Sequence, residues 1–508
     1  MLFLKGYDMS TKKHNGFASS FGFVLASAGS AVGLGNIWGF PYKTGANGGA
    51  AFVLVYILMA LLLGIVGMVV EMYVGKRAQA NPVTALKKIS PKFGFVGLLA
   101  VIVPFFIICY YSVLGGYTVR GVVASFMNIG KNASEVSESL SSFMSNPWLP
   151  AVCTFIFLGL AVLIIMGGVQ KGIEKASKVL MPLLFIILLG VMIYCLCLGE
   201  GVRAGLDFYI LKADFEALGW KGVAAAMGQV FFSMSLGMGI MISYGSYTGK
   251  EINLFKSAVQ ISLIDTAIAL MAGLAIFPAA FHFMEVEGVA AADVGLGGFA
   301  LMFMTLPLVF NSLGTVGGII GAFFFLMVSI AAITSVVSLV EVVTQFVIQK
   351  ARVSRKKAAV LPMILTMVVS VFVSLSLGGH FSLFGFDLLT FFDEITNTVL
   401  MPVCAFAVCV IAGYGIKKNE LRENIFPEKP GVGSFISFMA RFVTPLLILV
   451  VAVFGVVSNI SENATYFTVI IGAVMLALVS AIVYFACRFD RKDTGCNADE
   501  LASIADAD

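Results

Sequence analysis

The sequence predicts an all-α polytopic membrane protein with about twelve transmembrane helices. Of its 508 residues, 59% are hydrophobic and only 12% are charged, and the mean hydropathy is +1.00. A soluble domain typically carries about a quarter of charged residues. The composition therefore argues against a water-soluble enzyme, a disordered chain and a nucleic-acid-binding protein. The apolar residues gather in stretches of about 20, long enough for membrane-crossing helices, without the alternation of barrel strands.

The apolar stretches follow one another along most of the chain. The first is too long for the core of a signal peptide and lacks a small-residue cleavage site in the right place, so we expect it to be a retained span. The predicted spans lie near residues 17–41, 50–75, 95–126, 148–168, 177–198, 223–246, 257–284, 316–349, 358–378, 389–414, 434–458 and 466–487.

Lysine and arginine are distributed unevenly between alternate loops. Of the 32 such residues, 25 lie in the loops on one side of the predicted spans and five on the other, while Arg120 and Arg441 lie within spans. Positive residues concentrate on the cytoplasmic side of membrane proteins. We therefore predict an even number of spans, with both termini cytoplasmic, in the plasma (inner) membrane.

Cysteine and histidine are too scattered to indicate a redox or metal site. Most of the 8 cysteines lie in apolar runs, where they are expected to pack as small hydrophobic residues. The 3 histidines, His14, His282 and His380, stand far apart in the sequence and predict no histidine-based metal cluster. Because no nucleophile is clustered with a base either, we do not expect an intramembrane enzyme.

Two predicted spans contain clusters of glycine. Residues 31–36 of the first span read AVGLGN, and residues 233–239 of the sixth read SMSLGMG. Unwound backbone at membrane depth survives only where it lines a cavity or is buried in protein. The alternative is close packing of helices through small residues. The clusters stand at matching positions of two five-span halves, which favours a binding site of a transporter.

These clusters belong to longer blocks that resemble the neurotransmitter:sodium symporter family. Residues 29–38 read GSAVGLGNIW, with FPY at 40–42 and NGG at 47–49; residues 228–237 read GQVFFSMSLG, and residues 331–335 read AAITS. The resemblance implies a bacterial sodium-dependent amino acid transporter. It implies a 5+5 inverted repeat with broken helices 1 and 6, followed by two extra C-terminal helices, and transport by alternating access.

The resemblance also implies a division of the chain and the nature of its partners. We expect a small-molecule amino acid as substrate and contact with membrane lipid, without nucleic acid or an obligate protein partner. The expected segments are 1–16, a cytoplasmic N-terminal segment; 17–222, the first inverted repeat with helices 1–5; 223–415, the second with helices 6–10; 416–487, helices 11 and 12; and 488–508, a cytoplasmic tail.

By this resemblance the protein binds two sodium ions. Sodium site one is implied at Ala31, Asn36, Ser233 and Asp265. Sodium site two is implied at Gly29, Val32, Ala331, Thr334 and Ser335. Backbone carbonyls and hydroxyls are suitable oxygen ligands for a hard cation. For Thr334 and Ser335 the alternative is a hydrogen bond to their own helix.

The residues implied near sodium site one also bear on chloride. Asp265 stands where the family usually has an amide, and an acidic residue in mid-span is costly enough to indicate a function. Ala269 stands where chloride-dependent members have a serine, while Tyr56, Gln229 and Ser233 match the surrounding family positions. We expect Asp265 to supply the negative charge, so that no chloride is required. The alternative is a protonated or hydroxyl-paired structural aspartate.

The implied substrate site lies between the broken helices. The implied residues are Ala31, Leu34, Gly35, Ile107, Tyr111, Phe232, Ser235, Met238, Ser335 and Leu339. Leu34, Gly35 and Tyr111 are expected to hold a carboxylate, because exposed N–H groups at a half-helix end favour an anion. Gly33 replaces the acidic residue of monoamine carriers, so we expect a substrate with its own carboxylate, namely a neutral hydrophobic amino acid. For Ile107 and Met238 the alternative is ordinary packing.

The chain departs from the family at both gates. Gly39 and Thr396 replace the arginine and aspartate that close the outer vestibule, so we expect Phe232 and Tyr111 to close it without that ion pair.

At the cytoplasmic gate, Lys13 or His14 and Phe17 replace the usual basic residue and tryptophan, and Gln349 replaces an aspartate. Glu71 and Glu341 are expected to be structural, in networks with backbone or hydroxyl groups. A sodium symporter for another carboxylate-bearing amine and a passive channel remain alternative functions.

Overall fold

The structure is a computed structural model, and it describes residues 16–127, 133–249, 251–288, 301–312, 314–383, 386–417, 419–420, 425, 430–450 and 452–453. Every regular element in these ranges is a helix. The predicted twelfth span near 466–487, the tail, and the gate positions Lys13 and His14 lie outside the described residues.

The helices follow in chain order, including short 3-10 and π-helical segments labelled η. Their bounds are α1 Ser20–Ala31, η2 Gly35–Gly39, α2 Phe40–Ala46, α3 Ala50–Met59, η3 Ala60–Gly64, α4 Ile65–Ala78, α5 Pro82–Lys87, η4 Pro91–Phe93, α6 Gly94–Phe126, α7 Ala133–Ser145, α8 Leu149–Met166, η5 Val169–Glu174, α9 Lys175–Leu196, α10 Val202–Leu206, η6 Asp207–Leu211, α11 Phe215–Ser233, α12 Ile240–Ser246, α13 Leu254–Glu287, η7 Leu301–Thr305, α15 Leu306–Ser312, α16 Gly314–Ala351, α17 Arg355–Leu377, α18 Leu388–Glu394, η8 Ile395–Leu400, α19 Met401–Gly415, α21 Pro430–Phe438 and η9 Met439–Val443.

Long apolar helices dominate this part of the chain. Within the described ranges, nine helices are long and apolar enough to cross a membrane, and one bent pair of helices makes a tenth candidate. The nine are Ala50–Ala78, Pro91–Phe126, Leu149–Met166, Val169–Leu196, Leu254–Val286, Gly314–Ala351, Arg355–Leu377, Leu388–Gly415 and Gly431–Val450. They coincide with predicted spans two to five and seven to eleven, which confirms the all-α membrane class.

The first span is broken at its predicted glycine cluster. Helix α1 ends at Ala31, and Val32 adopts an extended conformation with φ −74° and ψ 108°. The helical path resumes in η2 and α2 at an angle of 51° to α1. The span therefore consists of two half-helices whose ends meet in the interior, because Ala31, Val32 and Leu34 are all at most 3% exposed.

The sixth span is broken as well. Helix α11 begins at Phe215, where the Asp214 carboxylate accepts a hydrogen bond from the Ala217 N–H at 2.8 Å, and it ends at Ser233. Residues 234–239 are not helical, and α12 follows. Ser235, Gly237 and Gly239 have φ values of 56°, 75° and 67°, in the left-handed region that glycine favours. Gly219, with φ 48° and ψ −172°, interrupts α11 after the first turn that Asp214 caps, so the continuous helix of this span follows Gly219, close to the predicted start at 223.

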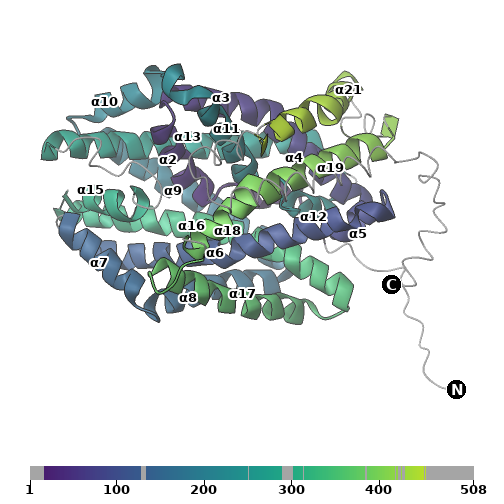
Figure 1. The fold of residues 1–508 in the computed structure, drawn as a ribbon, viewed down its shortest axis with the longest axis horizontal. Helices are drawn as coiled ribbons and strands as arrows, with labels where there is room; N and C mark the ends of the chain where they lie inside the picture. The colour runs from purple at the N-terminus through teal and green to yellow at the C-terminus, as the bar shows by residue number, and fades with distance from the viewer. Residues whose placement is uncertain are drawn as a thin grey trace.

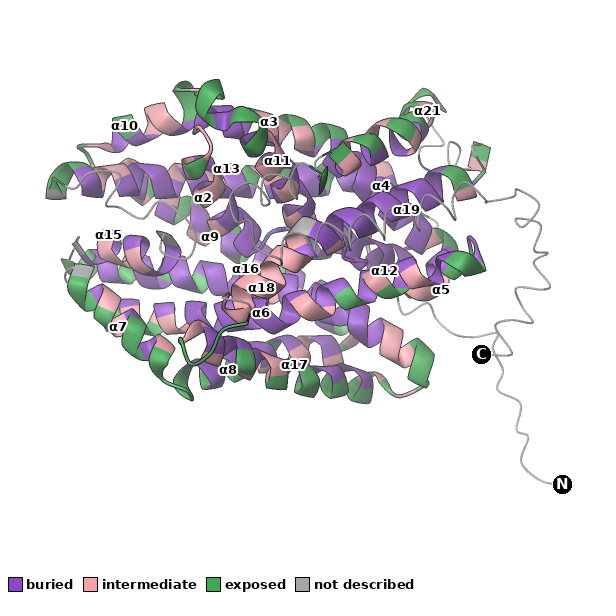
Figure 2. Cartoon of the chain, in the orientation of Figure 1, coloured by how far each residue is buried: buried purple, intermediate pink, exposed green. Residues whose placement is uncertain are grey.

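The helices differ in how deeply they lie in the bundle (Figure 1). Most of α16 is buried, whereas α8 and α17 expose apolar side chains such as Phe155 and Leu361 on the outside of the bundle (Figure 2). A helix that is apolar on its outer face suits contact with lipid chains. The short helices α7, α10 and α15 gather at one end of the bundle, and α5 lies at the opposite end.

Candidate functional site

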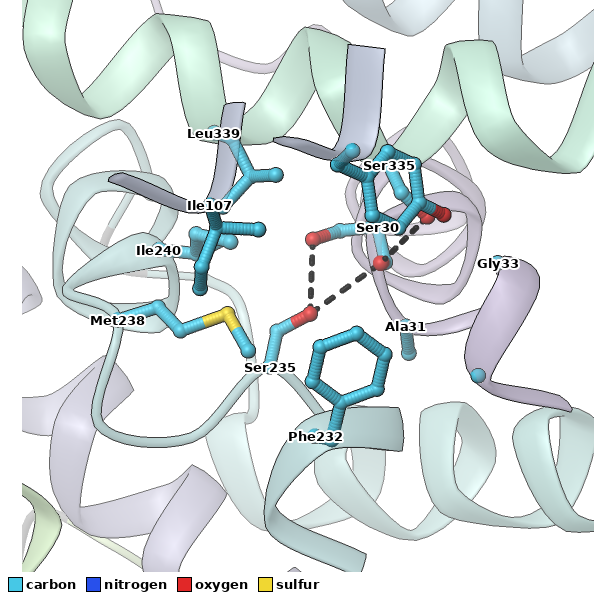
Figure 3. Close-up of a pocket in the computed structure, with 12 residues that line it drawn as sticks. Ser30, Ala31, Gly33, Ile107, Phe232, Ser235, Met238, Ile240, Ser335 and Leu339 are labelled. Atoms are coloured by element: carbon cyan, nitrogen blue, oxygen red, sulfur yellow. Dashed lines mark hydrogen bonds between the residues drawn. The ribbon is translucent and has the colours of Figure 1, made fainter. Parts of the chain in front are cut away.

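A small cavity of about 20 Å³ lies between the breaks of spans one and six. The Phe232 ring and the Met238 thioether reach into it, and Ile107 and Leu339 form an apolar wall (Figure 3). Among the described residues, no charged side chain lines it. Its lining is Ser30, Ala31, Gly33, Gly35, Ile107, Tyr111, Phe232, Ser235, Met238, Ile240, Ser335 and Leu339.

Nine of the ten residues expected around the substrate line this cavity. The exception is Leu34, which lines a larger cavity above it and whose N–H donates to the Tyr111 hydroxyl at 2.9 Å. Sequence reasoning missed Ser30, Gly33 and Ile240 as lining residues. Ser30 directly precedes Ala31 and Gly33 follows it by two residues, so the sequence already indicated that both lie near the break. The one sequence signal for Ile240 is its position directly after the second glycine cluster, where it begins α12.

Serine hydroxyls and carbonyls form the polar side of the cavity. The Ser335 and Ser235 hydroxyls donate to the Ser30 carbonyl at 3.1 and 3.2 Å. The Ser30 hydroxyl donates to the Ser338 hydroxyl at 2.6 Å and lies 3.2 Å from that of Ser235. These bonds tie span one to spans six and eight through neutral groups. The cavity therefore combines apolar walls with uncharged hydrogen-bonding groups.

Gly33 sits where a side chain has no room. A Cβ atom on Gly33 would lie 2.7 Å from the Tyr111 hydroxyl and would collide with the Ser335 hydroxyl. Both hydroxyls approach the bare backbone so closely that any side chain at this position would require them to shift. An acidic residue, as found at this position in monoamine carriers by the family resemblance, does not fit in this arrangement.

The residues implied for sodium site one form a buried cluster around Asp265. The Ser233 hydroxyl lies 2.9 Å from both Asp265 carboxylate oxygens, and the Asn36 amide donates to one of them at 2.7 Å. The Tyr56 hydroxyl donates to the other at 3.2 Å. All four side chains are at most 1% exposed. The fourth implied ligand, Ala31, lines the adjacent cavity.

The residues implied for sodium site two also meet. The Ser335 hydroxyl lies 3.2 Å from the Val32 carbonyl, and the Thr334 hydroxyl lies 2.9 Å from the Ala331 carbonyl. A Cβ atom on Gly29 would lie 3.4 Å from Thr334, so all five residues gather between α1 and α16. Thr334 also bonds its own helix through the Ile330 carbonyl at 3.2 Å, which is the arrangement expected of a hydroxyl in a span. The group offers only neutral oxygens.

The surroundings of Asp265 include the other positions that bear on chloride. The Gln229 amide donates to the Gly35 carbonyl at 2.6 Å. Ala269 is fully buried and contributes no polar side-chain atom. The acidic side chain beside Tyr56 and Ser233 is Asp265, whose carboxyl oxygens accept hydrogen bonds from both hydroxyls.

A larger cavity of about 320 Å³, the vestibule, lies above the small one. Phe232 and Tyr111 line both cavities and so separate them. The vestibule is lined by Leu34, Gly35, Trp38, Gly39, Tyr42, Lys43, Tyr110, Tyr111, Leu114, Gln229, Phe232, Leu377, Asp387, Leu389, Thr390, Asp393 and Asn397.

The charged groups of the vestibule are not those of the usual outer gate. Gly39 lines the wall without a side chain, and the Thr396 hydroxyl donates to the Phe392 carbonyl of its own helix at 2.8 Å. Lys43 on α2 and Asp393 on α18 line the vestibule instead, and Asp393 accepts a hydrogen bond from the Asn397 amide at 2.7 Å.

The opposite end of the bundle holds a buried ionic cluster. Glu341 is fully buried, forms an ion pair with Arg355, and accepts a hydrogen bond from the Tyr247 hydroxyl at 2.6 Å. We name these three residues the Glu341 cluster. Arg355 also donates to the Ile165 carbonyl at 2.9 Å. The expected hydroxyl partner of Glu341 is present, but sequence reasoning missed Arg355, which follows on the next helix.

Two further contacts close this end. The Gln349 side chain accepts hydrogen bonds from the backbone N–H and the side-chain amide of Asn81, the residue that caps α5. The Phe17 N–H donates to the Tyr247 carbonyl at 3.1 Å, and the Phe17 ring packs edge-on against Tyr244.

Glu71 was expected to have a structural role in a network with backbone or hydroxyl groups. Its carboxylate accepts a hydrogen bond from the Gly237 N–H at 2.8 Å, as that expectation requires.

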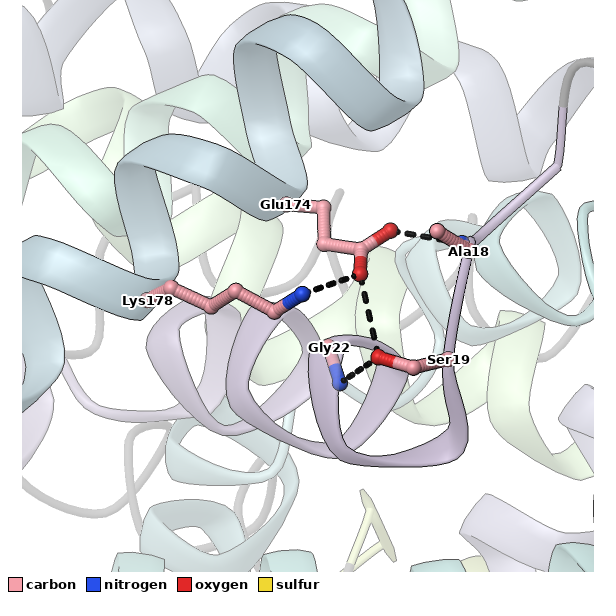
Figure 4. A network of polar contacts seen from close by, with 5 residues as sticks. All are labelled: Ala18, Ser19, Gly22, Glu174 and Lys178. Atoms are coloured by element: carbon pink, nitrogen blue, oxygen red, sulfur yellow. Dashed lines mark hydrogen bonds and ion pairs between the residues drawn. The ribbon is translucent and has the colours of Figure 1, made fainter.

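Glu174 fixes the start of α1 at the same end of the bundle (Figure 4). Its carboxylate accepts hydrogen bonds from the Ala18 N–H at 2.7 Å and the Ser19 hydroxyl at 3.1 Å, and it pairs with Lys178 at 2.7 Å. The Ser19 hydroxyl in turn accepts from the Gly22 N–H at 3.0 Å, as an N-cap residue does. Sequence reasoning did not single out Glu174, whose spacing to Lys178 on one helix is the only local signal.

Known proteins share both the sequence and this architecture. A family model described as the sodium:neurotransmitter symporter family matches residues 14–133 and 129–489. The chain is 36% identical over 456 residues to "Uncharacterized sodium-dependent transporter YhdH" of Bacillus subtilis, covering 87% of this chain and 98% of the relative. It is 28% identical over 297 residues to the mouse "Sodium-dependent neutral amino acid transporter B(0)AT2", covering 51% of this chain and 40% of that protein.

One solved structure extends the likeness to three dimensions. The crystal structure of MhsT in complex with L-phenylalanine superposes with a TM-score of 0.78 at 37% sequence identity, covering 86% of this chain and 98% of MhsT. The model match spans almost the whole chain, and the broken first and sixth spans enclose a cavity beside oxygen-rich clusters. This chain is therefore an integral, multi-pass membrane protein that belongs to the sodium:neurotransmitter symporter family.

Proposed function

We propose that this protein is a sodium-coupled symporter of a neutral hydrophobic amino acid, works by alternating access and needs no chloride. The observation that carries the proposal is the cavity between the two broken spans, which is uncharged and adjoins a buried carboxylate cluster. An uncharged cavity suits a zwitterion, because the ions and backbone dipoles beside it balance the charges of its amino and carboxylate groups.

The walls of the cavity support a hydrophobic side chain on the substrate. Ile107, Met238 and Leu339 offer apolar surface, and the flexible Met238 adapts to different shapes. The present volume of about 20 Å³ is smaller than an amino acid, so Phe232 and Met238 must move aside when substrate enters. MhsT, which has the same fold, was crystallised with L-phenylalanine, and this favours an aliphatic or aromatic substrate here.

Two sodium ions supply the driving force in this proposal. One binds at Ala31, Asn36, Ser233 and Asp265, and the other at Gly29, Val32, Ala331, Thr334 and Ser335. Each ion that moves inward releases about 2.3 kcal/mol per 100 mV, so two release about 4.6 kcal/mol. Coupling follows because the ions and the substrate stabilise the same arrangement of spans one, six and eight.

Asp265 replaces chloride in this scheme. Its carboxylate faces Tyr56 and Ser233, the residues that surround the anion in chloride-dependent members by the family resemblance. A second negative ion beside it is electrostatically unfavourable in a buried site. The charge that balances sodium is therefore part of the protein.

The proposal includes the organisation of the chain. The two halves at 17–222 and 223–415 form the inverted repeat, each beginning with a broken span, and the two later helices and both termini complete the molecule. The lysine-rich loops place both termini in the cytoplasm and the vestibule outside, in the plasma (inner) membrane.

Two measurements test the substrate and the coupling. A thermal-shift screen of the twenty amino acids, in sodium and in potassium, is expected to show stabilisation by neutral hydrophobic amino acids in sodium only. Proteoliposomes are then expected to accumulate that amino acid above equilibrium until the sodium gradient is removed. Stabilisation by charged amino acids alone, or equilibration without accumulation, would contradict the proposal.

A third measurement isolates the role of Asp265. Wild-type uptake is expected to be equal in chloride and in gluconate. Asp265→Asn keeps the hydrogen-bonding shape but removes the charge, so its uptake is expected to fall at least about tenfold in gluconate and to recover in part with chloride. The control is Ser374→Ala, which removes a hydroxyl from α17, a helix that carries none of the residues bonded to Asp265. Abolition of wild-type uptake in gluconate would refute chloride independence.

A further inference from the structure

Arg120 lies near the end of α6 on the vestibule side of the bundle. Its guanidinium donates one hydrogen bond to the Ser139 hydroxyl of α7 at 2.8 Å and lies 5.0 Å from the centre of the Phe143 ring. Within the described ranges, no carboxylate forms an ion pair with it. A guanidinium carries five N–H donors, so the described residues use only part of its hydrogen-bonding capacity.

The depth of Arg120 places it at the edge of the hydrocarbon. Along α6, Ile107 and Tyr111 line the central cavity, Leu114 lines the vestibule, and Arg120 follows nine residues after Tyr111. At 1.5 Å per residue this is about 13 Å from the level of the central cavity. The hydrocarbon core extends about 15 Å from the bilayer centre, so Arg120 reaches the layer of lipid phosphates.

An apolar groove of about 370 Å³ opens beside Arg120 between α6, α7 and α8. Val123 and Leu149 on its rim are 53% and 49% exposed, so the apolar groove opens on the outer surface of the bundle. Trp148, beside the groove at the start of α8, is 76% exposed, as is common for tryptophan at a membrane interface. The groove is lined by Val119, Arg120, Val123, Ala124, Ser139, Ser142, Phe143, Asn146, Leu149 and Cys153.

A second, smaller cavity adjoins the other side of Arg120. Arg120, Ala124 and Ser139 line both cavities, and the second is completed by polar groups such as Ser125 and by α15 and α16. This second cavity has a volume of only about 20 Å³ and a mixed lining, in which Ser125 and Asn311 lie among apolar side chains. Arg120 therefore stands at the edge of the much larger apolar groove, and the combination of one cation with an apolar groove suits an anionic lipid.

We propose that Arg120 and the groove bind an anionic phospholipid, with the headgroup phosphate on Arg120 and an acyl chain along Val119, Val123 and Leu149. A guanidinium pairs well with a phosphate through two parallel hydrogen bonds. Among the described residues that line the groove, Arg120 is a cation and none carries a carboxylate, so a headgroup such as glycerol is favoured over one with a positively charged amine. The bound lipid contacts α6, α7 and α8. None of these three helices carries a residue of the proposed sodium sites, so this lipid site is separate from them.

The test compares lipids bound to the purified full-length protein by native mass spectrometry. Equal amounts of phosphatidylglycerol and phosphatidylcholine are offered to the wild type, to Arg120→Gln and to Arg120→Lys. The wild type is expected to retain phosphatidylglycerol at least about tenfold more than phosphatidylcholine at one site, and Arg120→Gln to lose that preference. Arg120→Lys keeps the charge without the planar fork and is expected to be intermediate.

Two further variants make the result specific. Arg203→Gln removes one exposed positive charge from α10 at the same end of the bundle and is expected to bind like the wild type. Ala124→Phe fills the groove without removing Arg120 and is expected to lose the bound phosphatidylglycerol. If Arg120→Gln does not fold, the Ala124→Phe variant tests the lipid site in its place. Unchanged phosphatidylglycerol binding in Arg120→Gln or in Ala124→Phe overturns the proposal.

Soluble anions distinguish a lipid from an aqueous ligand. Inorganic phosphate and glycerophosphoglycerol carry the same charged group without acyl chains. At millimolar concentration they are expected to leave the thermal midpoint of the detergent-solubilised wild type unchanged, whereas phosphatidylglycerol raises it. If both soluble anions raise the midpoint of the wild type but not that of Arg120→Gln, the site binds an aqueous anion and the lipid assignment is wrong.

Discussion

The two ends of the bundle treat their charges differently. At one end the Glu341 carboxylate is fully buried and is bonded to both Arg355 and Tyr247, and nearby contacts join Gln349 to Asn81 and Phe17 to Tyr247. At the other end, Lys43 and Asp393 line a cavity of about 320 Å³, and the layer beneath them consists of Phe232 and Tyr111.

This difference follows from solvation. A buried charge is costly without a partner, so charges in the packed end must be bonded to one another. In the vestibule, Lys43 and Asp393 are partly exposed, Asp393 accepts a hydrogen bond from the Asn397 amide, and neither forms a direct ion pair within the described residues. Specific bonds therefore join the helices at the Glu341 end, whereas two aromatic side chains lie between the vestibule and the central cavity. Under the proposed function, alternating access requires the first set of bonds to break when the vestibule end closes.

The largest effect is expected from Arg355→Gln. This change leaves the buried Glu341 carboxylate without its cation, which costs on the order of 3 kcal/mol and weakens the closed end. We expect a clearly lower thermal midpoint and loss of accumulation in proteoliposomes. The double variant Glu341→Gln with Arg355→Gln removes both charges and should recover much of the midpoint. A single variant as stable as the wild type would show that this pair does not hold the end closed.

A strong but more local effect is expected from Phe232→Ala. The ring separates the vestibule from the central cavity, so its removal joins the two spaces and exposes the cavity to water. We expect at least a tenfold higher substrate KM, equivalent to about 1.4 kcal/mol, with little loss of stability. Phe232→Tyr retains the ring and should stay within a few fold of the wild type. Uptake kinetics of the three proteins provide the measurement, and equal KM values would contradict the assigned role.

A smaller effect is expected from Gln349→Ala. The lost side chain accepts two hydrogen bonds from Asn81, but that amide keeps a bond to the Thr84 hydroxyl at 3.1 Å. The expected loss is about 1 kcal/mol of stability, measured as a modest drop in thermal midpoint. Gln349→Glu preserves an acceptor at this position and should lose less than Gln349→Ala. The reverse order would mean that the contact does not stabilise this end.

The smallest effect is expected from Lys43→Gln and Asp393→Asn. Both charges face the vestibule, so each change should alter stability by less than about 0.5 kcal/mol. Their influence should appear only at low ionic strength, where screening is weak. Uptake at low and at physiological salt measures this, and Lys212→Gln, on an exposed position outside the vestibule, is the control. A large loss of stability in either variant would show that the vestibule charges are paired.

The sequence predicts those parts of the site that depend on local chemistry. The glycine clusters at 31–36 and 233–239 predict the two breaks, because glycine weakens a helix and the two clusters stand at matching positions of the two halves. Asp265 predicts a polar cluster around itself, because a mid-span carboxylate needs partners, and the structure surrounds it with Asn36, Tyr56 and Ser233.

Contacts that depend on helix rotation were not predictable in the same way. Whether Glu341 meets Arg355, or Glu174 meets Ser19, depends on the tilt and register of packed helices, which no spacing within one helix encodes. The same reason applies to Leu34, whose backbone position beside Tyr111 was expected but whose side chain turns toward the vestibule. The roles of these residues in transport stay predictions.

The crowding around Gly33 limits which cargoes this lineage can adopt. Any side chain at this α-carbon would place its Cβ atom against the hydroxyls of Tyr111 and Ser335, so an acidic residue there requires both hydroxyls to move. Under the proposed function, a change toward a substrate without an acid group therefore involves three positions at once. Directed evolution toward an amine substrate should vary Gly33, Tyr111 and Ser335 together.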